Sequence, residues 1–394
     1  MCHVSQRRNR NLSAVTNLHL CVRRSGVEFA YEYEYEVNMA FHSYARLPPT
    51  QQSAMVNAYA LVLALAVLML QTPAAALRLA VISKIIVDQV EGSVPRLGGG
   101  GVQAAVAAQI AMRGQSECRL VAPVGMDFVD SMLHGLAQRR VDTSGVCRLS
   151  HVARTPGEAI TYEGETAKWT PSGWDHWNEL CAWVPQLASA ADLDAVHVIV
   201  EGGGNGEVLS VLAALSELPA GERRPTISVE PVMHVVDDSS VAGLARITSI
   251  ADVVSPDLLT AYRLARPDDR QAEQHAARKV VEDGGEEALA VLARGCASTI
   301  ALRPTAVLAI RDGARGSYLL CNGELRHVPA LKLDKVLDPT GAGNGYAGAL
   351  AAQIASGATP MDAAAVASAV GAAFCRTGDW APTLEEGIAF CFGP

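Results

Sequence analysis

Short apolar runs that are rich in Val and Ile recur along residues 77–313, and segments of helical character separate most of them. A strand buried on both faces has this near-continuous apolar character, whereas a half-exposed strand alternates apolar and polar residues. The runs are 77–90, 118–125, 195–200, 226–231, 251–256 and 305–313, and the helical segments include 131–140, 206–217 and 270–295. Strands that alternate with helices form a mostly parallel sheet with helices on both faces. The pattern therefore predicts one α/β domain over residues 77–394.

One segment departs from this pattern. Residues 158–170, EAITYEGETAKWT, alternate apolar and polar side chains around Glu163-Gly164. Such alternation around a Gly-containing turn predicts a small β-hairpin with one face toward solvent. The hairpin is either a lid that covers a site or an ordinary edge of the sheet. As a lid, it also offers an exposed edge through which two copies of the chain could pair into a homodimer.

Residues 1–76 differ in composition from the rest. The first 27 residues hold five arginines and no Asp or Glu, and YEYEYE at 31–36 then alternates in a way that fits either a strand or a disordered segment. The apolar run 58–70 has about the length of a signal-peptide core and is shorter than the ~18–20 residues of a membrane-spanning helix. We interpret 1–76 as a targeting or disordered extension, with a membrane-anchoring helix and a core or amphipathic helix as alternatives. Without a targeting segment we expect a cytoplasmic protein, and we expect no membrane span in the folded domain.

The charge balance indicates which partners to expect. The formal net charge is −9, and Lys and Arg are scattered along the chain. Clustered cations are what bind nucleic-acid phosphates, so we expect no nucleic-acid partner. The nine cysteines include no CxxC pair and no Cys/His spacing typical of a metal site. We interpret them as mostly reduced, buried thiols.

The stretch LDPTGAGNGYAGALAAQ at 337–353 places Gly341, Ala342 and Gly343 at the start of an Ala-rich helix. The first turn of a helix presents unpaired backbone N–H groups and the positive end of the helix dipole. Glycines let an anion approach those N–H groups without a Cβ in the way. With the acidic Asp338 close by, the stretch predicts an anion site at its Gly-rich turn.

The same glycines formally fit the GxGxxG motif of dinucleotide-binding folds, from Gly343 to Gly348, with Asp362 further along. In a dinucleotide site that acid ends the next strand. Asp362 instead follows Thr359 and Pro360, which are typical of a helix cap and first turn. This context argues against a dinucleotide site, and the absence of GxxxxGK[ST] from the sequence excludes a P-loop.

Several motifs occur in the order seen in one enzyme family. DPTGAGN at 338–344 resembles the D-T-x-G-A-G-D signature of the PfkB-type, or ribokinase-like, carbohydrate and nucleoside kinases. Other segments similar to that family are 97–114, 121–146, 253–261 and 309–317, and the resemblance covers most of residues 79–376. It implies a three-layer α/β/α fold with a small β lid. It also implies ATP-dependent phosphorylation of a hydroxyl group on a sugar-like substrate, with Mg²⁺ as the metal.

The resemblance assigns roles to individual positions. The implied substrate positions are Asp88, Gly98, Gly99 and Gln103. Charge on the transferring phosphoryl group would be stabilised by Gly341, Ala342 and Gly343, and Asp338 would orient metal-bound water or phosphate. The nucleotide would be bordered by Arg311, Gly313 and Gly316, with Asp257 as a metal position. The position of the catalytic base is Asn344.

The base position departs from the family signature, which ends in Asp. An Asn cannot accept a proton from an attacking hydroxyl, and general-base help contributes about 10² to 10⁴ in rate. Gln103 also replaces an expected Asn, and Asp257 with Thr260 replaces the Asn and Glu of N-x-x-E. DPTGAGN together with Glu230-Pro231 resembles a divergent branch that includes the yeast maintenance-of-killer protein. Three interpretations stay open: a slow kinase, a catalytically silent binder of nucleotide or sugar, and a scaffold for partner contact.

Overall fold

The computed structural model describes residues 16–24, 27–35, 76–90, 95–163, 166–172, 193–201, 224–232 and 236–393. The chain forms two units, Met1–Ala75 with Pro394, and Ala76–Gly393. In the first unit, β1 (Thr16–Arg24) and β2 (Val27–Tyr35) pair as an antiparallel hairpin. Most of the alternating Tyr-Glu repeat therefore lies in a strand. The apolar run 58–70 lies outside the described residues, so the targeting interpretation stays a prediction.

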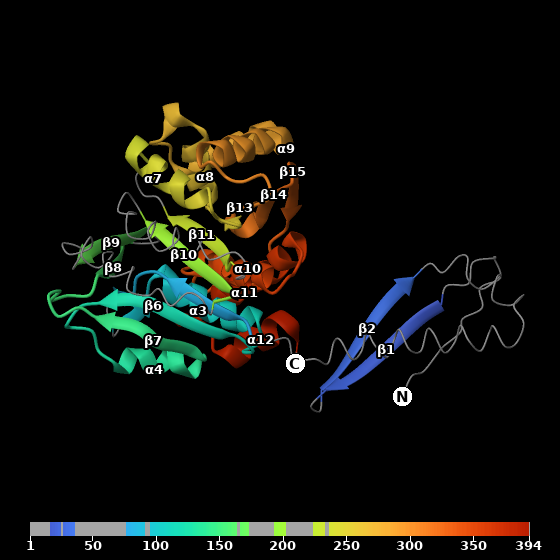
Figure 1. The fold of residues 1–394 in the computed structure, drawn as a ribbon, viewed down its shortest axis with the longest axis horizontal. Coiled ribbons are helices and arrows are strands. Elements are labelled where there is room, and N and C mark those ends of the chain that lie inside the picture. The colour runs from blue at the N-terminus through green and yellow to red at the C-terminus, as the bar shows by residue number, and fades with distance from the viewer. Residues whose placement is uncertain are drawn as a thin grey trace, which may run out of the picture. The chain divides into compact units, whose positions relative to one another are not determined.

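Nine of the described strands form the central sheet of the second unit, in the order β15-β14-β13-β12-β11-β10-β3-β6-β7 (Figure 1). Neighbours from β13 to β7 pair in parallel, and β13, β14 and β15 pair antiparallel. The predicted mostly parallel sheet is confirmed. The strands are β3 (Arg78–Ile82), β6 (Glu117–Val124), β7 (Val141–Arg148), β10 (Ala195–Glu201), β11 (Thr226–Val232), β12 (Val253–Val254), β13 (Val307–Arg311), β14 (Ser317–Cys321) and β15 (Glu324–Val328).

Helices cover both faces of this sheet. In β3, Leu79 and Val81 pack into one core with α3 (Gly100–Ala111), α4 (Ser131–Gln138), α10 (Ala342–Ala355), α11 (Pro360–Arg376) and α12 (Leu384–Phe392). The alternate residues Ala80 and Ile82 pack into a second core with α7 (Asp238–Thr248), α8 (Leu258–Ala265) and α9 (Gln274–Thr299). Successive strand side chains point to opposite faces, so one buried strand contributes to both cores. The three-layer architecture is confirmed.

The predicted strand at 77–90 is in fact two strands in two sheets. After β3, the amide of Ser83 still donates to the carbonyl of Val121 in β6. The chain then forms β4 (Ile86–Val90), and Val87 donates to Pro156 instead. β4 belongs to a separate sheet with the order β5-β4-β8-β9, where β5 is Arg96–Gly98, β8 is Gly157–Glu163 and β9 is Thr166–Ser172. Only Ser83 and Lys84 interrupt the apolar character at this change of sheet, and so short an interruption does not by itself predict a division of the segment.

Two hairpins lie at the edges of the sheets. β8 and β9 pair antiparallel from Gly157 opposite Ser172 to Glu163 opposite Thr166, which confirms the predicted hairpin. β14 and β15 form a second hairpin, which the strand pattern did not predict. Its turn residues Asn322 and Gly323 both have positive φ, as a type I′ turn requires. The Asn-Gly pair is therefore the sequence signal for this hairpin.

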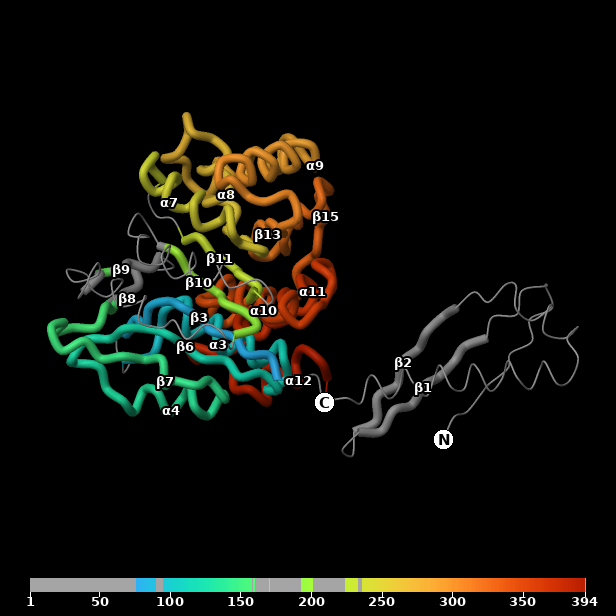
Figure 2. Tube along the Cα trace, viewed as in Figure 1, coloured from blue at the N-terminus to red at the C-terminus, as the bar shows by residue number. Residues whose placement is uncertain are grey.

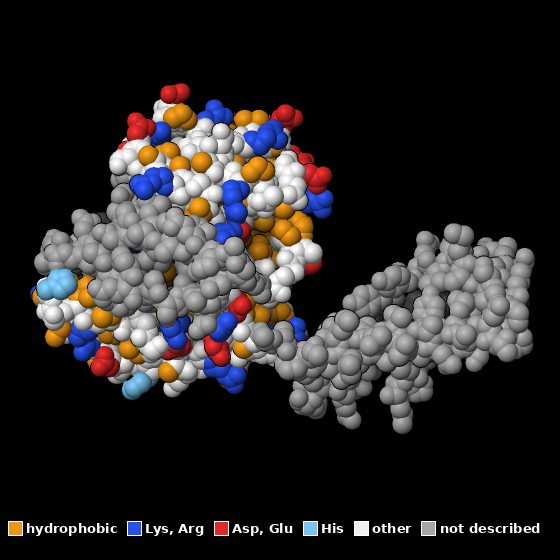
Figure 3. Space-filling model, viewed as in Figure 1, with side chains coloured by type: hydrophobic (Ala, Val, Ile, Leu, Met, Phe, Trp, Pro, Cys, Tyr) orange, Lys and Arg blue, Asp and Glu red, His pale blue; other side chains and the backbone are white. Residues whose placement is uncertain are grey.

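The surface of the described residues carries both signs of charge. Figure 3 shows Lys and Arg side chains interspersed with Asp and Glu on the face that it draws. The expected lack of a nucleic-acid partner stays a prediction. Among the helices of the described ranges, none combines the length and the apolar character needed to cross a bilayer.

The close packing of α3 against α10 positions the Gly-rich turn. The two helices pack against each other within one core, and their paths can be followed in Figures 1 and 2. A Cβ on Gly348 of α10 would lie 2.2 Å from the carbonyl oxygen of Ala104 in α3. A distance this short requires backbone movement, so Gly348 sets how closely the two helices approach.

We expect Gly348→Ala to destabilise the protein. Helix propensity alone would favour Ala by about 0.5–1 kcal/mol, but overpacking against backbone costs about 1–3 kcal/mol or more. Thermal unfolding followed by circular dichroism measures the sign. Gly378→Ala is the control, because nothing lies within 4 Å of its added Cβ, and we expect it to stay within about 0.5 kcal/mol of the parent. A higher melting temperature for Gly348→Ala would show that the helices are not held this closely.

Candidate active site

The first turn of α10 has free backbone donors. Gly341 is its N-cap residue, in the left-handed conformation with φ 81°, and no side chain caps the helix. Ala342 donates to the carbonyl of Pro339, and Gly345 donates to that of Gly341. The amides of Gly343 and Asn344 make no hydrogen bond within the described part of the chain. Two N–H groups at the positive end of a helix are thus available to an anion.

Close contacts bring the predicted substrate positions up to this turn. A Cβ on Gly341 would lie 2.4 Å from Cδ of Gln103, whose side chain comes from α3 and is buried. A Cβ on Gly100 would lie 2.6 Å from Nδ2 of Asn344. The absence of side chains at these glycines allows Gln103 of α3 to approach the Gly-rich turn, and Asn344 of α10 to approach the start of α3.

Of the remaining predicted substrate positions, Asp88 and Gly98 lie on strands of the small sheet, and Gly99 follows as the N-cap of α3. The buried carboxylate of Asp88, on β4, lies where a Cβ on Gly98 would be, 2.0 Å from Oδ2. Gly99 has φ 94°, and its Cβ would meet the carbonyl oxygen of Lys84 at 2.8 Å. The structure therefore brings together Asp88, Gly98, Gly99, Gln103, Gly341 and Asn344.

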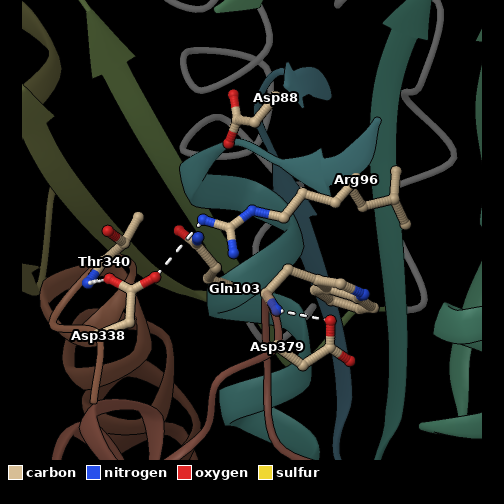
Figure 4. Close-up of a pocket in the computed structure, with 8 residues that line it drawn as sticks. Asp88, Arg96, Gln103, Asp338, Thr340 and Asp379 are labelled. Carbon is tan, nitrogen blue, oxygen red and sulfur yellow. Dashed lines mark hydrogen bonds and ion pairs between the residues drawn. The ribbon is translucent and has the colours of Figure 1, made fainter. Parts of the chain in front are cut away.

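A polar pocket lies between the small sheet and the turn before α10 (Figure 4). The guanidinium of Arg96, from β5, points toward Asp338, with Nη2 3.4 Å from Oδ2. The amide of Thr340 donates to Oδ1 of Asp338 at 2.8 Å. Burial alone would raise the pKa of Asp338, but the Thr340 hydrogen bonds and the charge of Arg96 lower it below its usual value. The pocket is lined by Asp88, Arg96, Leu97, Gln103, Asp338, Thr340, Asp379 and Trp380.

A buried charged network lies beneath the same turn. The carboxylate of Glu230, on β11, is fully buried. Nη1 of Arg311 lies 2.7 Å from its Oε1, and Nδ2 of Asn344 donates to the same oxygen at 2.9 Å. Nε2 of the buried His197 lies 3.6 Å from Oε2. Burial by itself would raise the pKa of Glu230, but Arg311, His197 and Asn344 outweigh it and lower the pKa, so the group is ionised.

The role of Glu230 was not predicted, although the sequence carries a signal for it. An acid inside the apolar strand TISVEPV would be costly to bury without a partner. The sequence thus indicates that a cation or donor must face Glu230. It does not say which one. Arg96 was also not predicted, because its neighbourhood gives no comparable signal.

The predicted nucleotide positions lie at the end of β13. Arg311 lies against α10, because a Cβ on Gly343 would come within 2.6 Å of its Nη1. Gly313 begins the 3₁₀ turn Gly313–Arg315, and nothing lies within 4 Å of its added Cβ. Gly316 has φ 103° and packs against the carbonyl of Val328. Gly343 and Arg311 therefore contact each other at the Gly-rich turn. Gly316 instead packs the end of the 3₁₀ turn Gly313–Arg315 against β15.

The described residues do not group into a metal site built from protein side chains alone. Asp257, the expected metal position, caps α8 by accepting a 2.6 Å hydrogen bond from the amide of Thr260. The carboxylate of Glu230 is already bound by Arg311 and Asn344. Within the part of the chain that the structure describes, no three His, Cys, Asp or Glu residues are grouped closely enough to hold a metal. The donors therefore suit an anion better than a divalent cation.

Comparison with known proteins gives a consistent result. Residues 242–385 match the model of the pfkB family carbohydrate kinases. A ribokinase from Cryptococcus neoformans, solved with ADP, is 18% identical with a TM-score of 0.60, covering 79% of this chain and 99% of that one. A putative ribokinase II from E. coli, solved with ATP and Mg²⁺, is 20% identical with a TM-score of 0.57, covering 80% and 98%.

A nucleoside kinase from Burkholderia thailandensis, solved with inosine, is also similar. It is 17% identical with a TM-score of 0.55, and the match covers 80% of this chain and 97% of that one. Sequence comparison with curated proteins gives no significant match. The chain thus has a ribokinase-like α/β fold, with a mostly parallel central sheet and helices on both sides.

We expect Glu230→Gln to destabilise the protein by about 3–5 kcal/mol at pH 7, because it leaves Arg311 as a buried cation without its counter-charge. The folded pKa of Glu230 is below its ordinary value of 4.5. Its carboxylate therefore contributes stability above about pH 4.5, and this is lost as the pH falls through the lower folded pKa.

Denaturant unfolding of the parent and of Glu230→Gln between pH 3 and pH 7 tests this expectation. The difference between their free energies of unfolding should become smaller in acid. Glu324→Gln is the matched control, because its ion pair with Arg326 is exposed and such pairs contribute about 0–1 kcal/mol. Equal stability of Glu230→Gln and the parent at pH 7 would contradict the ion pair.

Proposed function

We propose that this chain is a PfkB-type carbohydrate-kinase-like protein that binds ATP at the start of α10 and a sugar-like hydroxyl compound beside Asp88. The observation that carries the proposal is the uncapped first turn of α10, with free amides at Gly343 and Asn344. The pfkB family match over 242–385 supports the class of protein. The ADP, ATP and inosine in the titles of similar structures support the class of ligand.

The reaction would transfer the terminal phosphoryl group of ATP to a substrate hydroxyl, leaving ADP and a phosphorylated sugar-like product. Next to Gly98 and Gly99, Asp88 would accept hydrogen bonds from substrate hydroxyls, and Gln103 would donate hydrogen bonds to them. Within the turn Gly341–Gly343, Ala342 already donates to Pro339, so the free amide of Gly343, with that of Asn344, would stabilise charge on the phosphoryl group in the transition state. Arg311, Gly313 and Gly316 would border the phosphates of the nucleotide. We assign no step to Mg²⁺, because the described donors do not fit it.

The expected rate is low. Asn344 lies at the position of the base, and its Nδ2 donates to Glu230. An amide cannot take the proton from the attacking hydroxyl, so the step lacks a factor of about 10² to 10⁴.

The same hydrogen bond favours a second candidate function. Asn344 and Arg311 are both held by Glu230, so neither side chain acts as a base. In this second function the protein binds nucleotide or sugar without turnover. The finer resemblance to the branch of the yeast maintenance-of-killer protein rests on DPTGAGN and Glu230-Pro231. A scaffold for partner contact, a lid role for the β8–β9 hairpin, a homodimer through it, and a targeting role for residues 1–76 also stay proposals.

We expect ATP and a subset of sugars and nucleosides to raise the melting temperature of the full chain. A ligand at 100 times its dissociation constant stabilises the folded state by about 2.7 kcal/mol. Gly341→Val should remove the ATP shift, because its Cβ would meet Gln103 at 2.4 Å. Asp88→Asn should weaken the sugar shift and leave the ATP shift intact.

Release of ADP, measured with each stabilising sugar, separates the two candidate functions. Turnover in the unaltered protein supports the kinase, and shifts without turnover support the silent binder. If no nucleotide, polyphosphate or sugar changes the melting temperature, the binding functions are wrong and the scaffold interpretation is left.

A further inference from the structure

The guanidinium of Arg311 is built into the proposed phosphate site. Its side chain is 11% exposed and emerges from the end of β13. Nη1 contacts Oε1 of Glu230 at 2.7 Å, and it would lie 2.6 Å from a Cβ on Gly343. A full positive charge therefore lies in contact with the first turn of α10, next to the free amides of Gly343 and Asn344.

Arg311 has donor capacity to spare. A guanidinium carries five N–H donors, and the contact with Glu230 uses Nη1. Nε is buried and has no hydrogen-bond partner among the residues that the structure describes. A buried donor without an acceptor is costly and therefore marks a place where an acceptor is missing. A guanidinium can bind a carboxylate through one nitrogen and phosphate oxygens through others.

The neighbouring acid is arranged for this cation and not for a metal. Glu230 is the described carboxylate that contacts Asn344, and Arg311 already neutralises it. A divalent cation bound to Glu230 would have to displace the guanidinium or lie beside it, and like charges at contact distance repel. Asp257 is engaged as the cap of α8. The positive charge that phosphate requires is therefore supplied by the chain.

The amide at Asn344 follows from the same arrangement. With Glu230 and Arg311 opposed, the network is neutral, and the helix terminus leaves the site attractive to an anion. An Asp at this position would place a second carboxylate about where Nδ2 now lies, 2.9 Å from Oε1 of Glu230. It would repel Glu230 as well as an incoming phosphate. Asn344 instead donates a hydrogen bond, so Glu230, Arg311 and Asn344 form one interdependent set.

We propose that Arg311 is the fixed cation of this site, and that the chain binds its polyphosphate ligand as the free anion, without Mg²⁺. This inference rests on the proposed phosphate-binding function and specifies the form of the ligand. Chelation by Mg²⁺ lowers the negative charge of ATP and occupies the oxygens that Arg311 and the amides would contact. Added Mg²⁺ should therefore weaken binding or leave it unchanged.

Calorimetric titration of the full chain tests this, with ATP and inorganic tripolyphosphate as probes, in excess EDTA and again in excess Mg²⁺. We expect the affinity in EDTA to equal or exceed that in Mg²⁺. The double variant Arg311→Gln with Glu230→Gln removes both charges, so that neither is left buried alone. It should fold and lose about tenfold or more in affinity in EDTA, since a charge-assisted bond to phosphate is lost. The double variant Arg326→Gln with Glu324→Gln makes the same change of charge on an exposed pair and should bind as the parent does.

Binding that requires Mg²⁺ would overturn the inference and leave the proposed function standing. Unchanged affinity of the folded double variant in EDTA would also overturn it, because Arg311 would then not contribute. If neither probe binds in either condition, the proposed phosphate site itself is wrong, and the inference is wrong with it.

Discussion

The ion pair between Arg311 and Glu230 is the interaction on which the arrangement of the candidate site depends. It joins β13 to β11 next to the first turn of α10. Asn344 of α10 donates a hydrogen bond to the same carboxylate oxygen of Glu230, which links the helix to both strands. A buried ion pair is not a large net source of stability compared with apolar residues, because desolvation offsets much of the attraction. Its effect is to favour one arrangement of β11, β13 and α10 over alternative arrangements. Moving any of these three elements would leave a buried charge or donor without its partner. The ion pair and the Asn344 hydrogen bond thus hold the Gly-rich turn against the sheet, in addition to the packing of α10.

The second requirement is close approach. A Cβ on Gly348 would collide with the backbone of Ala104, and a Cβ on Gly341 or Gly343 would push away the side chain of Gln103 or Arg311. Interiors are packed densely enough that a single methyl group shifts its neighbours. Gly348 therefore sets the distance between α3 and α10, and Gly341 and Gly343 leave room for the side chains of Gln103 and Arg311 at the Gly-rich turn. The left-handed φ of Gly341 also turns the backbone at the start of α10, where the amides of Gly343 and Asn344 stay free.

The site has two halves from different parts of the chain. The proposed phosphate side comes from α10 and the end of β13, whereas Asp88 and Arg96 come from the small sheet that the chain enters after β3. The ion pair of Arg96 with Asp338 links these halves. The charges lie in a way that suits an anion over the helix and hydroxyl groups beside Asp88. The chemistry at position 344 separates this site from one with a carboxylate base, because its side chain donates a hydrogen bond where a base would accept one.

The sequence by itself determined the class of fold, the β8–β9 hairpin and the position of the Gly-rich turn at a helix start, because each depends on local pattern: apolar runs, alternation and glycines before an Ala-rich segment. It also held a signal for the β14–β15 hairpin in Asn322-Gly323, and for a partner of Glu230 in the acid within a buried strand. Only the tertiary structure decided that 77–90 divides between two sheets, because both sides of Ser83 are apolar enough to form a buried strand and the sequence does not name the partner strands. It also decided that Arg311 is the partner of Glu230. That contact follows from the strand order β11-β12-β13, which brings together residues far apart along the chain and is not encoded in the spacing of either one.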